Sequence, residues 1–246
     1  FIVPLIFSDM AHARRVYLSD LYQSVVPASL MKNQNIYPFP AVINFFGLRW
    51  AGQFELKKPA DLAGKEFRVM PAPVFVQFVE LFDAKVVEVA TAELAVAMQS
   101  GMMECLLIGT GVGYMESLGY CNYNDYCILD PMFTISPSEM VWSLDWWQRL
   151  PADVQQKYID IGQGPWTDKW WPLYVNYIEK GVDDEGSSPN YVVNNAKVSY
   201  NLSAEEQKAF RDVLAPLYED FDNQYFGGKM MAVVEAERSK TEFNTQ

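Results

Sequence analysis

The sequence lacks several features that would place it in a common functional class. No run of about 18 apolar residues occurs, so we expect no segment to span a membrane. Basic residues are few: 19 lysines and arginines stand against 31 aspartates and glutamates, a formal net charge of −12. Such a surface repels phosphate backbones and anionic lipid headgroups. We therefore expect no nucleic-acid partner and no membrane insertion, and an anionic ligand would need a local positive site.

Histidine and cysteine are also scarce. His12 is the only histidine and has no evident partner for a hydrolase nucleophile. The three cysteines contain no Cys-x-x-Cys pair, which argues against zinc and thioredoxin chemistry. Spacing alone leaves one bridge open, for instance Cys121 to Cys127. We predict no enzyme, no catalytic residue and no cofactor; a metal ion that bridges protein and ligand is an alternative that nothing in the sequence indicates.

The residues that are present describe a globular chain. It has 246 residues, of which 50% are hydrophobic and 15% aromatic. That length and composition give enough material for a substantial core in one large domain or two lobes.

Residues 59–109 have the most regular pattern. Thr91 is predicted to cap a helix that Gly101 ends. The predicted elements are strands over 66–70, 85–89 and 104–108, with helices over 73–83 and 92–100. Such an alternation predicts a mostly parallel sheet covered by helices. Ligands of these folds bind at the carboxyl ends of the strands.

The flanking regions are less regular. Pro27 is expected to end a helix, and Pro38 with a second proline two residues later is expected to break the chain before a short buried strand over 41–46. The second half reads as more helical. Ser203 and Glu206 fit a capping box, which predicts the start of a long helix.

Arg68 is the residue that most needs an explanation. It lies among apolar neighbours in a predicted strand, and a partly buried charge is costly unless something pairs with it. The loop over 70–73 leads into a helix start, where a carboxylate would meet a guanidinium fork and a helix dipole together. From the pattern alone, a structural pair with Glu66, Glu88 or another carboxylate of the protein is an equally open interpretation.

Several motifs, taken in order, resemble one known family. They are Pro59-Ala60-Asp61-Leu62-Ala63-Gly64 with Arg68-Val69, Met98-Gln99-Ser100-Gly101 with Met103-Glu104-Cys105, Pro4-Leu5-Ile6-Phe7 with Ala11-His12-Ala13, and Trp147-Gln148-Arg149-Leu150-Pro151. Over nearly its whole length the chain resembles the substrate-binding proteins of tripartite ATP-independent periplasmic (TRAP) transporters, the DctP-like family. Members of that family have a longer amino-terminal portion, which this sequence is expected to lack.

The resemblance implies an α/β fold of two lobes with mostly parallel sheets, a hinge, and a ligand cleft between the lobes. The expected division assigns 1–47 and 135–175 to lobe I, incomplete at its amino terminus, and 48–134 and 176–246 to lobe II. It also implies a periplasmic solute receptor, its signal peptide removed, that delivers a small organic acid to TRAP membrane subunits. The alternatives are an exported interaction protein with a degenerate cleft and a hydrolase.

The resemblance also suggests the residues of the site. The predicted ligand-binding residues are Arg68, Arg49, Trp50, Met70, Ile108 and Tyr114. In the family the arginine matched by Arg68 holds the ligand carboxylate, and Arg49 is an approximate counterpart of a second arginine. The alternative to a place in the cleft is that Arg49 and Trp50 form a pair at the solvent-exposed edge of the protein. Ile108 stands where many members carry asparagine, which favours a smaller or more apolar acid than a sugar acid.

Overall fold

A computed structural model describes residues 3–70, 72–109, 122–166, 168–169, 172 and 196–240. Its helices are α1 (Met10–Tyr17), α2 (Asp20–Gln34), α3 (Pro73–Glu80), α4 (Leu94–Gln99), α6 (Leu144–Gln148), α7 (Ala152–Ile161), α10 (Ala204–Phe226) and α11 (Met230–Arg238), with 3₁₀ turns η1 (Pro59–Leu62) and η2 (Thr91–Glu93) and a π-helical turn η4 (Gly162–Trp166). Its strands are β1 (Ile36–Gly52), β2 (Glu66–Val69), β3 (Lys85–Glu88), β4 (Cys105–Gly109), β5 (Tyr126–Asp130), β6 (Thr134–Ser143) and β7 (Val198–Asn201).

These strands form one sheet of seven, in the order β3-β2-β4-β1-β5-β7, with β6 paired to β1. The pairs β2–β3, β2–β4 and β5–β7 are parallel. β1 is antiparallel to β4, β5 and β6. Every one of these strands except β1 therefore points the same way, which confirms the predicted mostly parallel α/β sheet; the reversed central strand β1 was not predicted.

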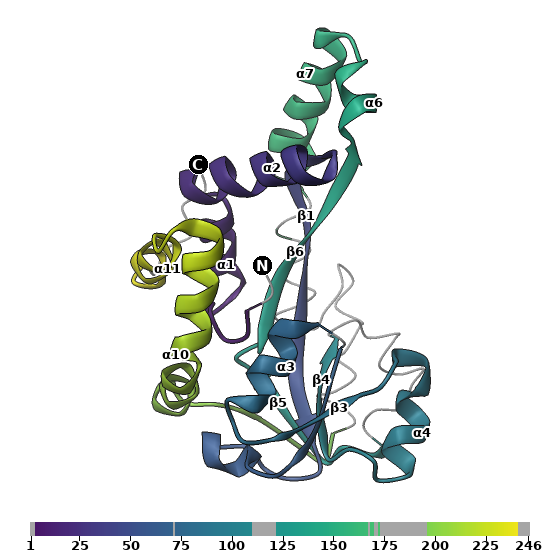
Figure 1. The fold of residues 1–246 in the computed structure, drawn as a ribbon, viewed down its shortest axis with the longest axis vertical. Coiled ribbons are helices and arrows are strands. Elements are labelled where there is room, and N and C mark those ends of the chain that lie inside the picture. The colour runs from purple at the N-terminus through teal and green to yellow at the C-terminus, as the bar shows by residue number, and fades with distance from the viewer. Residues whose placement is uncertain are drawn as a thin grey trace.

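β1 is much longer than the strand predicted over 41–46, and it runs straight through both of its prolines. Residues 36–47 pair with β6 alone among the described strands, and the register is irregular between Pro38 and Asn44. Proline lacks an N–H and is tolerated at sheet edges and bulges, so a two-stranded ribbon with bulges accommodates it. Figure 1 shows this β1–β6 ribbon extending from the sheet to the tip that carries α6 and α7.

Aromatic packing holds that tip together. Tyr37 of β1 stacks on Trp147 of α6, with ring centroids 4.1 Å apart, and Trp142 of β6 stacks on the same Trp147 at 5.2 Å. Tyr158 of α7 packs edge-on against Trp142 at 5.0 Å. Trp142 and Trp147 are therefore packing residues.

The prediction that Pro27 ends a helix was wrong, because α2 continues through it. The hydroxyl of Ser19 accepts from the Tyr22 N–H at the start of α2, and Asn35 takes the left-handed conformation at its end, where its N–H donates to the Leu30 carbonyl. Well-capped ends stabilise the helix, and a proline inside it costs only one backbone hydrogen bond and a local clash.

The alternating unit over 66–109 is confirmed as β2, α3, β3, η2 with α4, and β4. Gly101 has φ +71°, as expected of a residue that ends a helix. Thr91 was predicted to cap the second helix, and this was wrong: its hydroxyl makes no capping bond, and the segment begins as the short 3₁₀ turn η2. The hydroxyl of Thr91 is used elsewhere, as described below.

The capping box that starts α10 is confirmed. The Ser203 N–H donates to the Glu206 carboxylate at 2.7 Å, and the Glu206 N–H donates to the Ser203 hydroxyl at 3.2 Å. The helix then continues for 23 residues, past Pro216, to Gly227 with φ +62°.

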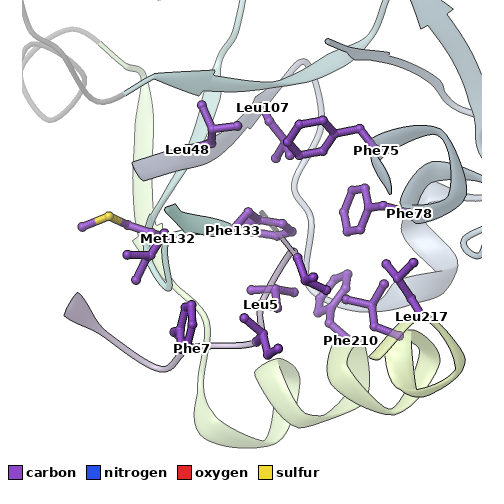
Figure 2. Close-up of a cluster of buried hydrophobic side chains, with 14 of the residues drawn as sticks. Leu5, Phe7, Leu48, Phe75, Phe78, Leu107, Met132, Phe133, Phe210 and Leu217 are labelled. Atoms are coloured by element: carbon purple, nitrogen blue, oxygen red, sulfur yellow. The ribbon is translucent and has the colours of Figure 1, made fainter. Parts of the chain in front are cut away.

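The two faces of the sheet carry different cores, with α3 and α4 on opposite sides (Figure 1). The main core lies on the side of α3, α10 and α1 and is rich in aromatic side chains. Figure 2 shows Phe78 of α3 and Phe133 lying near Phe210 of α10, with Leu5 beside them. The small core on the α4 side consists of Ala51, Val89, Leu94, Ala97, Met98, Met103, Leu106 and Cys127.

Cys105 and Cys127 are both buried, and Cys121, the other residue of the bridge considered from the sequence, lies outside the described residues. Burial raises the pKa of the Cys105 thiol well above its ordinary value, so this side chain is a neutral packing residue.

Two boundaries of the predicted lobes, 47/48 and 134/135, lie at the same level of the β1–β6 ribbon. Gly47 pairs with Ile135 and Leu48 pairs with Thr134, so both predicted boundaries cross the ribbon between the same two rungs. However, the main core contains Leu5 from predicted lobe I and Phe210 from predicted lobe II. The division itself stays a prediction.

Candidate functional site

Arg68 lies on the α4 side of the sheet. Its neighbours Phe67 and Val69 belong to the main core, and side chains alternate along a strand, so Arg68 points to the opposite face. Its partners in register are Val87 of β3 and Leu106 of β4, and both pack in the small core. Only 4% of Arg68 is exposed. The sequence therefore places a charge in an apolar layer, where its contacts must stabilise it.

Backbone and hydroxyl oxygens hold the Arg68 guanidinium. Its Nε and Nη2 both donate to the Val89 carbonyl, at 3.0 and 2.8 Å, and Nη2 also lies 3.4 Å from the hydroxyl oxygen of Thr91. Glu66, one of the structural partners considered from the sequence, lies 3.9 Å from the Lys85 ammonium. These contacts orient the guanidinium through neutral oxygens.

Arg49 is buried on the same face. It lies two residues before Ala51 of the small core, and its strand partner is Ile108 of β4. Its Nε donates to the Leu129 carbonyl at 2.8 Å, and 5% of the residue is exposed. Burial raises the pKa of the nearby Asp130 carboxyl and the charge of Asp9 raises it further, whereas Arg49 lowers it. Arg49 is therefore close enough to Asp130 to interact with it electrostatically.

The two arginines lie close together at one edge of the sheet. Arg68 is on the Leu106 rung of β4 and Arg49 is on the Ile108 rung, one strand away on the other side. Two strand spacings and two residues of rise put their Cα atoms about 12 Å apart. Because every strand but β1 points the same way, this is the carboxyl edge, where ligands of such sheets bind.

The other predicted site residues do not join this pair. Trp50 is fully buried in the main core on the opposite face, with its ring centroid 5.3 Å from that of Phe54. Met70 packs against the main core as well. The backbone of Ile108 pairs with Arg49, but its side chain lies outside the described residues, as does the whole of Tyr114. The structure therefore brings together Arg49 and Arg68 and separates them from Trp50 and Met70.

Sequence reasoning missed the groups that hold the two guanidinium groups. They are the carbonyls of Val89 and Leu129 and the hydroxyl of Thr91. Backbone carbonyls have no sequence signature, because every residue has one. Thr91 was visible as a polar residue shortly after a strand, but the pattern favoured a helix cap there.

A separate groove of about 850 Å³ lies between α2, α3 and α10. Its lining is mostly apolar, for example Val25, Val74 and Phe221, and Asp220 is its one charged residue. Arg49, Trp50, Arg68 and Met70, the predicted ligand residues whose side chains are described, do not line it. An apolar lining with one acidic side chain does not suit a carboxylate, so this groove is a poor candidate for the site.

His12 has a structural position. The Ser8 N–H donates to its Nδ1 at 3.1 Å, so Nε2 carries the proton and donates to the Val234 carbonyl of α11 at 2.8 Å. Burial lowers the pKa of His12 to about 4. Within the described ranges no group of three or more metal-ligating side chains comes together, and none of the helices there is long and apolar enough to cross a membrane.

Comparison with known proteins identifies the family. The profile of bacterial extracellular solute-binding protein family 7 (DctP) matches residues 1–224. The chain belongs to this family. It is therefore a member of a family of extracellular solute-binding proteins, as the sequence motifs implied. No curated protein matches the chain significantly.

Solved structures of TRAP periplasmic solute-binding proteins share the fold of this family 7 chain. The Shewanella oneidensis protein with bound succinate has a TM-score of 0.72 and 20% identity, and the match covers 97% of this chain and 74% of the Shewanella chain. For the Haemophilus influenzae RdAW protein with bound L-gulonate, the TM-score is 0.74 and the identity 17%, and the match covers 96% of this chain and 73% of that protein. For the Desulfovibrio desulfuricans protein with bound sn-glycerol-3-phosphate, the TM-score is 0.75 and the identity 15%, and the match covers 100% of this chain and 75% of that protein. The two-lobed solute-receptor fold is thereby confirmed.

Proposed function

We propose that this family 7 receptor works in the periplasm, where it captures a small organic acid and delivers it to TRAP membrane subunits. Arg68 is the residue proposed to bind the acid's carboxylate directly, and Arg49 is the second cationic group of the proposed site. The observation that carries the proposal is the burial of two guanidinium groups on one face, at the carboxyl edge of the sheet.

Charge supports this assignment. The chain as a whole carries a formal net charge of −12, so an anion is repelled by most of the surface and needs a local cationic site. Two buried arginines supply such a site, and in a dry environment a bidentate guanidinium–carboxylate pair is strong and geometrically specific. The ligands named for the three solved relatives, succinate, L-gulonate and sn-glycerol-3-phosphate, are all anions at neutral pH.

The proposed acid is small and carries few hydroxyl groups. Ile108 lies directly beside Arg49 in the sheet, and it replaces the asparagine that the family motif leads one to expect. An alkyl side chain cannot hydrogen-bond the hydroxyl groups of a sugar acid, and a buried hydroxyl without a partner is costly. We expect succinate-like acids to bind more tightly than gulonate.

The proposed mechanism is closure of the two lobes over the bound acid. The predicted lobe boundaries cross the β1–β6 ribbon between the Gly47–Ile135 and Leu48–Thr134 rungs, which would let the ribbon act as a hinge. Closure requires that the acid bind the closed form more tightly than the open form, because a ligand with equal affinity for both shifts nothing. The membrane subunits would then recognise the closed form.

Thermal unfolding with a panel of acids tests the proposal. The panel contains succinate, L-malate, a 2-oxo acid, an aromatic acid, L-gulonate and sn-glycerol-3-phosphate. An acid at a hundredfold its dissociation constant should add about 2.7 kcal/mol to the free energy of unfolding and raise the midpoint. Arg68→Ala should abolish that increase. Arg68→Lys should weaken it strongly, because lysine keeps the positive charge but lacks the two parallel N–H donors of the guanidinium.

The exposed Arg149 gives a matched control, because Arg149→Ala removes an arginine far from the sheet edge and should leave binding unchanged. The midpoint without acid shows whether each variant still folds. Unchanged affinity in a folded Arg68→Ala protein would overturn the site. No response to any acid would favour the interaction-protein alternative, and turnover of any panel member would favour an enzyme.

A further inference from the structure

A second pair of arginines lies where α10 and α11 meet the amino-terminal segment of the chain. Arg238, the last residue of α11, donates from Nη2 to the Ile6 carbonyl at 2.7 Å. Tyr218 of α10 donates from its hydroxyl to the Pro4 carbonyl at 2.9 Å. Side chains from both helices therefore converge on one short segment. Arg211 lies seven residues before Tyr218 on α10, a spacing that places it on the same face of the helix.

The two guanidinium groups are close enough to repel each other. Burial lowers the pKa of Arg211, and the charge of Arg238 lowers it further. Nearby carboxylates act in the opposite direction, but each has another partner. Glu235 pairs with Arg238 Nε at 3.1 Å, and Asp212 pairs with the Lys208 ammonium at 2.6 Å. Among the described residues Arg211 makes no hydrogen bond or ion pair of its own, so the junction keeps a surplus positive charge.

One donor of this pair has no acceptor. Nη1 of Arg238 is buried and, within the part of the chain that the structure describes, donates to no atom. Nearly all buried polar groups in proteins have a partner, and an unmet donor on a charged group points to an ion or a water molecule at that place. The pair can be reached from solvent, because 18% of the Arg238 side chain is exposed and Arg211 is only half-buried.

We propose that Arg211 and Arg238 form a binding site for a small oxyanion such as phosphate or sulfate, with Tyr218 beside them. An anion between the two guanidinium groups accepts hydrogen bonds from Arg238 Nη1 and from Arg211, and it offsets the repulsion between the two charges. Arginine suits this role because its planar fork matches the oxygen atoms of such anions. The bound anion thereby links α10 to α11.

This site goes beyond the proposed function and is separate from the acid site. Ile6 and Tyr218 belong to the main core, whereas Arg68 lies on the opposite side of the sheet, under α4. The two sites share no residue. Each can therefore be removed without touching the other.

Calorimetric titration with inorganic phosphate tests the oxyanion site, at pH 7 and at an ionic strength held constant with sodium chloride, since salt screens charge pairs. The natural protein should show saturable binding, and sulfate should bind to the same site. Arg211→Gln should weaken phosphate binding at least about tenfold, as expected when a hydrogen bond between charged groups is lost. Glu235→Gln should strengthen it about twofold to fivefold, because it removes a competing negative charge.

The matched control is Arg149→Gln, which removes the same charge at the end of α6, at the tip of the β1–β6 ribbon (Figure 1). It should bind phosphate as the natural protein does. Arg211→Lys keeps the charge and should bind more tightly than Arg211→Gln but less tightly than the natural protein. Because Arg211 makes no described bond, Arg211→Gln should fold with a midpoint close to that of the natural protein without phosphate.

The outcomes separate this site from the acid site. No saturable binding of phosphate or sulfate, or equal phosphate affinity in Arg211→Gln and the natural protein, would overturn the inference and assign a water molecule to the Arg238 donor. Phosphate binding that is lost in Arg68→Ala but kept in Arg211→Gln would overturn it as well, because the phosphate would then occupy the acid site. Phosphate binding that depends on Arg211 would support the oxyanion site even if succinate does not bind and the proposed function fails.

Discussion

The two faces of the central sheet solve different problems with adjacent residues of the same strands. In β2, Phe67 and Val69 enter the aromatic main core, whereas Arg68 between them enters the small core under α4. In β1, Trp50 joins the main core, whereas Arg49 beside it lies on the α4 side. Alternation along a strand therefore divides a stability face from a charged face with one-residue precision.

The difference shows what each face can tolerate. The main core gains its stability from close packing of large side chains, so any loss of volume there is felt. The α4 face holds a smaller apolar cluster and has two buried charges, which cost free energy unless they are bound by oxygen atoms. The α3–α10 face therefore maintains the fold, and the α4 face carries Arg68 and Arg49, the arginines proposed to bind the acid.

The largest expected effect comes from Phe78, at the centre of the main core. Phe78 is fully buried and packs edge-on against Phe67, Phe82 and Phe133, with ring centroids 5.7, 5.2 and 6.4 Å away. Phe78→Ala should lower the free energy of unfolding by about 3–5 kcal/mol, because it removes the ring and leaves a cavity. Urea unfolding measures this directly.

Leu94→Ala in α4 is the matched change on the other face. Leu94 is buried in the small core, so its truncation should cost about 2–3 kcal/mol, near the lower end of the range for such changes. A larger loss from Leu94→Ala than from Phe78→Ala would contradict the assignment of the main core as the stability face.

The next effect is the pH dependence that His12 gives to the junction of α1 and α11. Its folded-state pKa is about 4 against an ordinary value of 6.5, so between those values the unfolded chain binds more protons than the folded protein. The contribution of His12 is therefore complete above pH 6.5 and is lost as the pH falls toward 4. Each pH unit in this window is worth at most about 1.4 kcal/mol, so lowering the pH from 7 to 5 should cost up to about 2 kcal/mol.

Urea midpoints at pH 7 and pH 5 test the role of His12, with His12→Gln as the variant that cannot titrate. The charged neighbours of His12 are Arg238, Asp9 and Arg15, and all are present in both proteins. The difference between the two pH slopes therefore reports the histidine alone. If the free energy of unfolding changed with pH equally in the natural protein and in His12→Gln, His12 would bind protons equally in the folded and unfolded states, and its lowered pKa would be contradicted.

Much of the fold was predictable because local chemistry and tertiary packing agree. The alternating unit over 66–109 has clear signals for where helices start and end: a proline at the start of α3, and Gly101 with φ +71° after α4. The failures occur where tertiary contacts override a local signal. Pro27 and Pro38 predicted breaks, but the caps of α2 and the two-stranded ribbon accommodate them.

The site was predictable only in part, for a related reason. Arg68 stood out because a charge in an apolar strand violates the expected pattern, and the structure confirms that it is buried. Trp50 was placed with Arg49 because the two are adjacent in sequence, but adjacent residues of a strand point to opposite faces. The oxygen atoms that hold the guanidinium groups come from β5 and from the segment that follows β3, and the pairing of β3 with β2 and of β5 with β1 brings them near.

The smallest expected effect comes from Ser203 at the start of α10. The buried apolar residues of this helix, such as Phe210, belong to the main core and not to the small core. Ser203→Ala removes one half of the capping box and should lower the free energy of unfolding by about 1 kcal/mol. The exposed Ser24 of α2 is the control, because its hydroxyl bonds only the Leu21 carbonyl of its own helix, and Ser24→Ala should change stability by less than about 0.5 kcal/mol. Succinate affinity measured in the same two variants should equal that of the natural protein. If Ser203→Ala weakened succinate binding, the two faces of the sheet would be energetically coupled, and the separation of a stability face from a ligand face would fail.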